Sequence, residues 1–162
     1  MPIVGGDEIM GNAAKDTLIL SSNRVWSATP SEYSSMRFLQ FQPDGQAELI
    51  YAYGQTIYAV CRCRWSVPVT GELRLTELAI TGGHLKGYEP STSERDRDLT
   101  YRLTEVNASF EQPLTSSSPF EYRWSLELSE PPWPTGLGLP YSVPRVFYGR
   151  GSAETENDES NE

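Results

Sequence analysis

The side chains of this chain best suited to acid–base chemistry are two glutamates, Glu77 and Glu105. Each interrupts a row of apolar residues that recurs at every second position. Two carboxyl groups that meet in an apolar interior raise one another's pKa, and such a pair can serve as general acid and base. The alternative is that each strand reaches the end of the fold at its glutamate, where the carboxylate meets water. The sequence leaves both interpretations open.

Cysteine and histidine are scarce, which limits nucleophilic and metal chemistry. Cys61 and Cys63 stand two residues apart on an expected strand, and the single histidine, His84, follows two glycines in a long loop. Neither cysteine has the sequence context of a catalytic nucleophile. Together with His84 they would still lack the fourth ligand of a zinc site. We therefore expect two small buried thiols, an exposed histidine, no metal and no cofactor.

Three residues near the end of the chain could recognise a ligand or a protein partner. Arg145 and Phe147 share one face of an expected last strand, and an arginine inside an apolar barrel would bind a carboxylate through two hydrogen bonds. The alternative is an arginine at the strand's edge, directly after Pro144. Trp133 lies in a stiff Pro-Pro-Trp-Pro segment, and an exposed tryptophan there would favour contact with another protein.

The segments that must position these residues have the two-residue period of strands. In residues 120–128 the apolar positions Phe120, Tyr122 and Trp124 alternate with charged or small polar ones, which is typical of a half-buried antiparallel strand. Pro43-Asp44-Gly45 is a hairpin signal between two such segments. Comparable patterns predict seven further strands, at residues 17–26, 36–42, 46–53, 56–67, 72–80, 99–112 and 143–150.

Strands that follow one another in this way must bury their apolar faces. They do so by closing a barrel or by stacking two sheets, and the regular meander favours the barrel. We expect an all-β protein, a single antiparallel up-and-down barrel of about eight strands. One short helix, from Thr29 to Ser35, would close one end. Such a barrel either fills its interior or holds one small ligand. The aromatic residues expected to line it, in a form suited to a planar or chain-like apolar ligand, are Trp26, Phe38, Tyr51, Trp65, Tyr101 and Trp124.

The charge pattern disfavours several classes of partner. The net charge of −9 argues against nucleic acid and against anionic membrane surfaces. Residues 151–162 hold five acidic and no basic side chains, so we expect a disordered acidic tail there. We expect a flexible arm over residues 1–16 and one domain over residues 17–150. We find no signal peptide and no membrane-spanning stretch, and two reduced thiols indicate the cytosol.

The chain resembles the calycin group, which comprises the lipocalin and fatty-acid-binding barrels. The hairpin that runs from Phe38 to Ala47 and on to Trp65 carries the resemblance, together with the order of a Trp-bearing first strand, a short helical segment and a meander. This resemblance implies a lipocalin-like barrel that binds a small hydrophobic molecule. Arg145-x-Phe147 is similar to the Arg-x-Tyr that holds the ligand carboxylate in fatty-acid-binding proteins, with phenylalanine in place of tyrosine. The lipocalin Gly-x-Trp start is replaced by Arg24-Val25-Trp26.

The leading hypothesis is a cytosolic barrel that binds a small apolar molecule without catalysis. Arg145 would hold a carboxylate if the ligand carries one, and Phe147 and the inward aromatic residues would form the wall. Two alternatives stay open. One is a barrel enzyme of the cyclase or isomerase type with Glu77 or Glu105 as base. The other is a solid-core interaction module that contacts proteins through the loop at Trp133.

Overall fold

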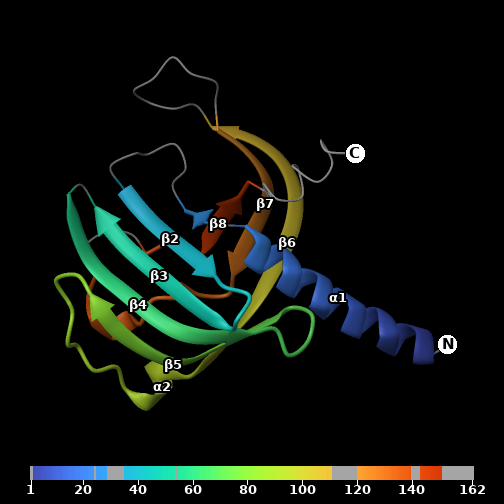
Figure 1. The fold of residues 1–162 in the computed structure, drawn as a ribbon, viewed down its shortest axis with the longest axis horizontal. Coiled ribbons are helices and arrows are strands. Elements are labelled where there is room, and N and C mark those ends of the chain that lie inside the picture. The colour runs from blue at the N-terminus through green and yellow to red at the C-terminus, as the bar shows by residue number, and fades with distance from the viewer. Residues whose placement is uncertain are drawn as a thin grey trace.

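The protein is an eight-stranded antiparallel barrel in which every strand pairs with the next along the chain and β1 pairs with β8 to close the ring (Figure 1). This confirms the predicted all-β up-and-down barrel. The computed structural model describes residues 2–23, 25–28, 35–53, 55–110, 120–139 and 143–150. The strands are β1 (Trp26–Ser27), β2 (Ser35–Phe41), β3 (Gln46–Tyr53), β4 (Thr56–Ser66), β5 (Glu72–Gly82), β6 (Arg97–Phe110), β7 (Phe120–Leu128) and β8 (Val146–Gly149); the helices are α1 (Pro2–Ser22), α2 (Thr92–Arg95) and the 3₁₀ turn η1 (Thr135–Leu137).

Strand β4 shows how the alternating sequence sets the two faces of the barrel. Cys61, Cys63 and Trp65 are buried in the core, whereas Arg62 and Arg64 are exposed on the outer face. A charged side chain left inside without a partner would lose its hydration, so the strand turns its arginines outward. The prediction that the cysteine face points inward is confirmed.

Strand β5 contains a bulge that turns Glu77 to the outer face. The pairing of β4 with β5 shifts between Arg62 and Arg64, so that Glu77 and Leu78 both stand opposite Cys63. Glu77 adopts a φ of 56°, which is rare outside glycine, and Leu78 becomes the buried residue. The prediction that Glu77 continues the inward row is therefore wrong, because one extra residue reverses the alternation beyond it.

The barrel has two differently closed ends. At the helix end, on the right in Figure 1, the last turns of α1 cover the opening. Leu20 is fully buried there, its carbonyl accepts a hydrogen bond from Trp26 Nε1 at 3.0 Å, and the Tyr101 hydroxyl donates to Asp16 Oδ2 at 2.5 Å. At the opposite end, the loop end, the chain closes the barrel with residues 83–96, which carry α2, and with residues 129–139, which we call the plug loop.

The N-terminal segment differs from its sequence prediction. Residues 2–22 form α1, whereas an irregular arm was expected over residues 1–16 and a strand over residues 17–26. Gly5, Gly6 and Gly11 lower the intrinsic helix propensity of this segment and hide the helix from a sequence-based prediction. In the described part of the chain, no helix has the length and apolar character that crossing a membrane requires.

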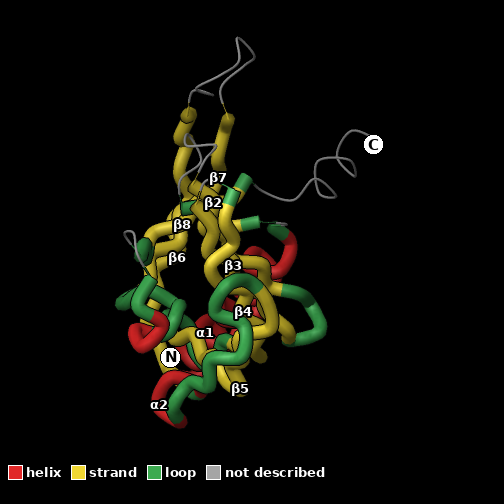
Figure 2. Tube along the Cα trace, turned by 90° about the vertical axis from the view of Figure 1, so that its left-hand side faces the viewer, coloured by secondary structure: helices red, strands yellow, loops and turns green. Residues whose placement is uncertain are grey.

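Strands β6 and β7 continue past the barrel as a two-stranded ribbon, which rises at the top of Figure 2. β5 pairs with β6 only over residues 72–75, and β8 reaches β7 only as far as Trp124. The ribbon is therefore separate from the barrel interior. The predicted helix over residues 29–35 falls outside the described residues, apart from Ser35 in β2, and the predicted acidic tail lies wholly outside them.

Candidate functional site at the loop end

The plug loop is held across the loop end by hydrogen bonds with two side chains. Arg97, at the start of β6, donates from Nη1 to the Pro131 carbonyl at 3.2 Å and to Glu130 Oε1 at 3.3 Å, and from Nη2 to the Pro132 carbonyl. Glu94 of α2 accepts a hydrogen bond from the Gly136 N–H at 2.9 Å. Arg97 thus fixes the plug loop to strand β6, and Glu94 fixes it to the other closing loop, residues 83–96.

Trp133, at the tip of the plug loop, enters the barrel interior. Its exposed fraction is 1%, and its ring lies 5.7 Å from the ring of Tyr51 on β3 and 5.9 Å from the ring of Phe147 on β8. The interplanar angles are 80° and 52°, the edge-to-face and tilted arrangements that aromatic pairs prefer. The space between these two wall residues is therefore filled by a loop residue and not by a strand residue.

The indole N–H of Trp133 finds no acceptor among the described residues, although it is buried. The other two buried tryptophans satisfy theirs. Trp26 Nε1 donates to the Leu20 carbonyl at 3.0 Å, and Trp65 Nε1 donates to the Gln42 carbonyl at 2.9 Å. A buried donor without an acceptor costs about 1–3 kcal/mol, so native structures rarely keep one without a reason.

The interior at this end carries positive charge. Arg37 of β2 is 5% exposed, and its guanidinium lies 5.8 Å from the centre of the Tyr51 ring. The Arg97 side chain is 11% exposed, and burial lowers its pKa while Glu130 opposes the shift. No aspartate or glutamate of the described residues is buried. Among the described residues, the acidic side chain paired with Arg97 is Glu130, which is itself more than half exposed.

The two thiols are chemically inert at neutral pH. Burial raises the pKa of Cys61 to about 12, with a smaller contribution from Cys63, and burial likewise raises the pKa of Cys63 to about 12. Arg97 opposes both shifts. Protonated thiols are neither nucleophiles nor metal ligands, so here they act as small apolar wall groups. The described residues include no cluster of His, Cys, Asp and Glu that would hold a metal ion.

The aromatic residues expected inside the barrel divide into three groups. Trp26, Tyr51, Trp65 and Phe147 are buried in one core cluster. Tyr101 and Trp124 are half-buried against that cluster, and the Tyr101 hydroxyl bonds to Asp16 of α1. The prediction that Phe38 points inward is wrong. Leu39 and Phe41 form the buried face of β2, and the strand alternation places Phe38 on the other face, where it is half-buried.

Arg145 does not reach the interior. Its side chain is 51% exposed, and Nη1 donates to Glu127 Oε2 and to the Leu128 carbonyl, both at 3.1 Å. The residue precedes β8, and an acidic partner on the neighbouring strand holds it on the outer surface. Arg145 therefore lies at the strand's edge, which was the alternative interpretation, and the guanidinium that holds the plug loop belongs to Arg97. The sequence offered only a weak signal for Arg97, since it lies in the charged run 94–98.

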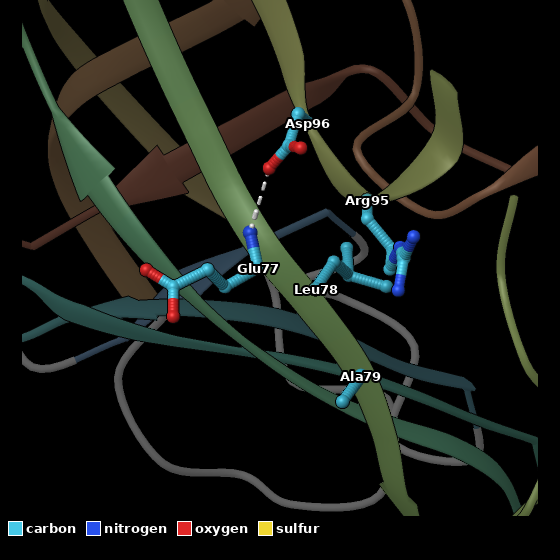
Figure 3. A pocket seen from close by; sticks show the side chains of 5 residues that line it. All are labelled: Glu77, Leu78, Ala79, Arg95 and Asp96. Carbon is cyan, nitrogen blue, oxygen red and sulfur yellow. Dashed lines mark hydrogen bonds between the residues drawn. The ribbon is translucent and has the colours of Figure 1, made fainter. Parts of the chain in front are cut away.

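The two glutamates are also outside, so they form no acid–base pair in the interior. Glu105 bonds to Arg123 at 2.9 Å, and Glu77 lies 3.9 Å from Arg64 on the outer face. Glu77 borders a shallow cleft of about 350 Å³ between the β5 bulge and the end of α2 (Figure 3). Figure 3 shows its carboxylate pointing away from Arg95, while its N–H donates to Asp96 Oδ1 at 3.0 Å. The bulge is thus held by the bond from the Glu77 N–H to Asp96, and the Glu77 carboxylate beside the cleft is exposed to solvent.

The structure also shows where His84 and Trp133 lie. His84 is exposed, as predicted, and its ring lies 6.1 Å from that of Tyr58. Trp133 was considered as a surface anchor for a protein partner, and the structure buries it instead.

Comparison of the chain with known protein families, curated proteins and solved structures finds no match.

Proposed function

We propose that the protein binds a small, mainly apolar molecule inside the barrel at the loop end, without transforming it. The observation that carries the proposal is Trp133, a loop side chain that fills the interior with an unsatisfied indole N–H. A residue needed only for packing would more simply come from a strand and would have its donor satisfied. A loop residue, in contrast, can leave and return as a ligand binds.

The way in which the loop is held supports a removable closure. Its contacts include the hydrogen bonds that Arg97 donates to its carbonyls and the one that its Gly136 N–H donates to Glu94, and water can replace each of these when the loop swings out. The wall behind Trp133 would then consist of Tyr51, Phe147 and their aliphatic neighbours. Apolar walls with a small number of placed polar groups are typical of small-molecule sites.

The other functions have less support. A barrel enzyme would need Glu77 or Glu105 inside, and both are exposed. An interaction module that uses Trp133 would need the indole at the surface. We also propose a cytosolic location, because Cys61 and Cys63 are both free thiols.

Native mass spectrometry of the full chain as purified, followed by extraction into organic solvent, tests the binding function. We expect a stoichiometric adduct that extracts as one apolar compound. If the purified chain has the mass of the polypeptide alone, and a panel of aliphatic and aromatic probes at millimolar concentration adds none, the barrel is a solid core and the proposal fails.

A further inference from the structure

We infer that the ligand is a planar aromatic carboxylate, which takes the place of the Trp133 indole and is bound through its carboxylate by Arg97. This inference rests on the binding function proposed above and makes it specific. It has three parts: the shape of the space that Trp133 occupies, the acceptors that Arg97 loses when the plug loop leaves, and the charge of the surrounding interior.

The shape of the space selects a flat group. The indole lies between Tyr51 and Phe147, each of which meets it at a ring-centroid distance below 6 Å. An aromatic ring that replaced the indole would keep the edge-to-face contact with Tyr51 and the tilted contact with Phe147, whereas an alkyl chain would lose both. In the closed protein, the Trp133 indole therefore occupies the place that the aromatic ring of the ligand would take.

The hydrogen bonds of Arg97 select an anion. The guanidinium donates to the carbonyls of Pro131 and Pro132, the two residues directly before Trp133. When the plug loop leaves with its tryptophan, both acceptors leave with it. A carboxylate on the incoming ring would offer two oxygens to the same donors, in the planar geometry that arginine recognises best.

Among the described residues, no acidic side chain lies in the interior around Arg97. Cys61 and Cys63 are protonated, and no acidic side chain of the described residues is buried. The remaining acidic partner of Arg97 is Glu130, whose side chain is 56% exposed and belongs to the plug loop itself. A neutral ligand would leave the buried guanidinium without a counter-charge once the loop opens.

The test uses three probes on the full chain: indole-3-acetate, its neutral amide indole-3-acetamide, and laurate. Affinities are measured by calorimetry, and the Trp133 Nε1–H signal, assigned with W133F, is followed by ¹H–¹⁵N NMR. We expect the acetate to bind at least tenfold more tightly than the amide and to move the Trp133 signal toward that of a solvent-exposed indole. We expect W133A, which lacks the competing ring, to bind the acetate at least tenfold more tightly than the wild type.

Two variants with the same change of charge separate the interior arginine from the outer one. R97Q should abolish the preference for the acetate over the amide, whereas R145Q should keep it. If R97Q does not fold, R97K replaces it and should reduce the preference, because lysine keeps the charge but lacks the two-pronged geometry.

Each contrary result has a definite meaning. Equal affinity for acetate and amide, or a preference that survives in R97Q or R97K, overturns the assignment to Arg97. Binding of laurate alone overturns the aromatic ligand and leaves the proposed binding function standing. If folded wild type and W133A bind none of the three probes, and no probe of the wider panel, the inference and the proposed function fall together.

Discussion

The Glu94 carboxylate joins the two loops that close the barrel, because its Oε2 accepts the Gly136 N–H at 2.9 Å. On its own loop, the same carboxylate accepts the Ser91 N–H at 2.8 Å and the Tyr88 hydroxyl at 3.4 Å. A side chain at Gly136 would collide with Tyr88 and Glu94, so only glycine allows this approach. The position of Trp133 inside the barrel therefore depends on a residue about 40 positions earlier in the chain.

Glu94→Gln should loosen the plug loop without unfolding the barrel. Glutamine keeps one acceptor oxygen and loses the charge, so one of the bonds at Gly136 or Ser91 is weakened. A net loss of about 1 kcal/mol in local stability corresponds to roughly fivefold faster amide exchange at Gly136. Hydrogen exchange measured by NMR should show this change in the plug loop and none in β3 or β4. Glu89→Gln, an exposed glutamate of the same loop, is the matched control and should leave exchange at Gly136 unchanged.

The same contact should fail in acid. The Ser91 N–H lowers the pKa of Glu94 most, the Gly136 N–H and the hydroxyls of Ser91 and Tyr88 add to this, and burial opposes it. A lowered pKa stabilises the folded state above the ordinary glutamate value of about 4.3, and that stability is lost as the pH falls below it. Exchange at Gly136 should therefore accelerate in acid beyond its intrinsic pH dependence. Glu94→Gln should remove the excess, and an excess that persists in the variant would assign it to another group.

The buried thiols should make the barrel less stable in alkali. Their pKa values are raised to about 12, whereas an unfolded cysteine has a pKa of about 8.5, so the unfolded chain loses these protons first. Stability is full below about pH 8.5 and should then fall by about 1.4 kcal/mol per pH unit for each thiol. Urea unfolding at several pH values measures the slope, and Cys63→Ala should roughly halve it. An unchanged slope in that variant would mean that the thiols do not cause it.

The fold could be predicted from the sequence because its strands alternate so regularly. Strands β2 to β8 and their order follow from the two-residue period, whereas the predicted first strand is mostly helix α1 and leaves only Trp26 to β1. Within β4, Cys61 and Arg62 already distinguish the inner face from the outer one. The period fails where the backbone adds a residue. Nothing in the local sequence marks Glu77 as the bulge, because the bulge depends on the pairing with β4 and on the hydrogen bond that the Glu77 N–H donates to Asp96, and these partners are distant along the chain.

The candidate site was less predictable, because it is built from loops. Trp133 was recognised as unusual, but proline-rich segments carry no period, so the sequence could not tell an indole turned outward from one turned inward. In the structure, Arg97 begins β6 and Arg145 directly precedes β8, and neither position shows from the sequence which guanidinium is buried. What separates them is their acceptors: two carbonyls of the plug loop for Arg97, and the Glu127 carboxylate on the outer surface for Arg145.

Replacing Glu77 with glycine should stabilise the protein. The φ of 56° at Glu77 strains any residue with a Cβ atom, and its ion pair with Arg64 is long and exposed, so its loss matters little. We expect a gain of about 0.5–1 kcal/mol in the free energy of unfolding. Ala79→Gly, two residues further along the same strand in ordinary β geometry, should lower the free energy of unfolding by about the same amount. Urea denaturation of both variants gives the comparison, and a destabilised Glu77→Gly would show that the side chain is needed at the bulge.

The unsatisfied indole of Trp133 leads to a comparison of two tryptophans that are both almost completely buried. Trp→Phe removes an N–H and part of a ring in each case. At Trp26 it also leaves the buried Leu20 carbonyl without its donor, which should add about 1–3 kcal/mol to the cost of the smaller ring. At Trp133 no acceptor of the described chain is lost, so the substitution should relieve the cost of a buried, unpaired donor. We therefore expect Trp133→Phe to be the milder change by at least about 1 kcal/mol in urea unfolding at neutral pH. If Trp133→Phe proves as costly as Trp26→Phe, the Trp133 N–H is bonded in the folded protein. The plug loop would then be an ordinary part of the core, and the main argument for a ligand in its place would be lost.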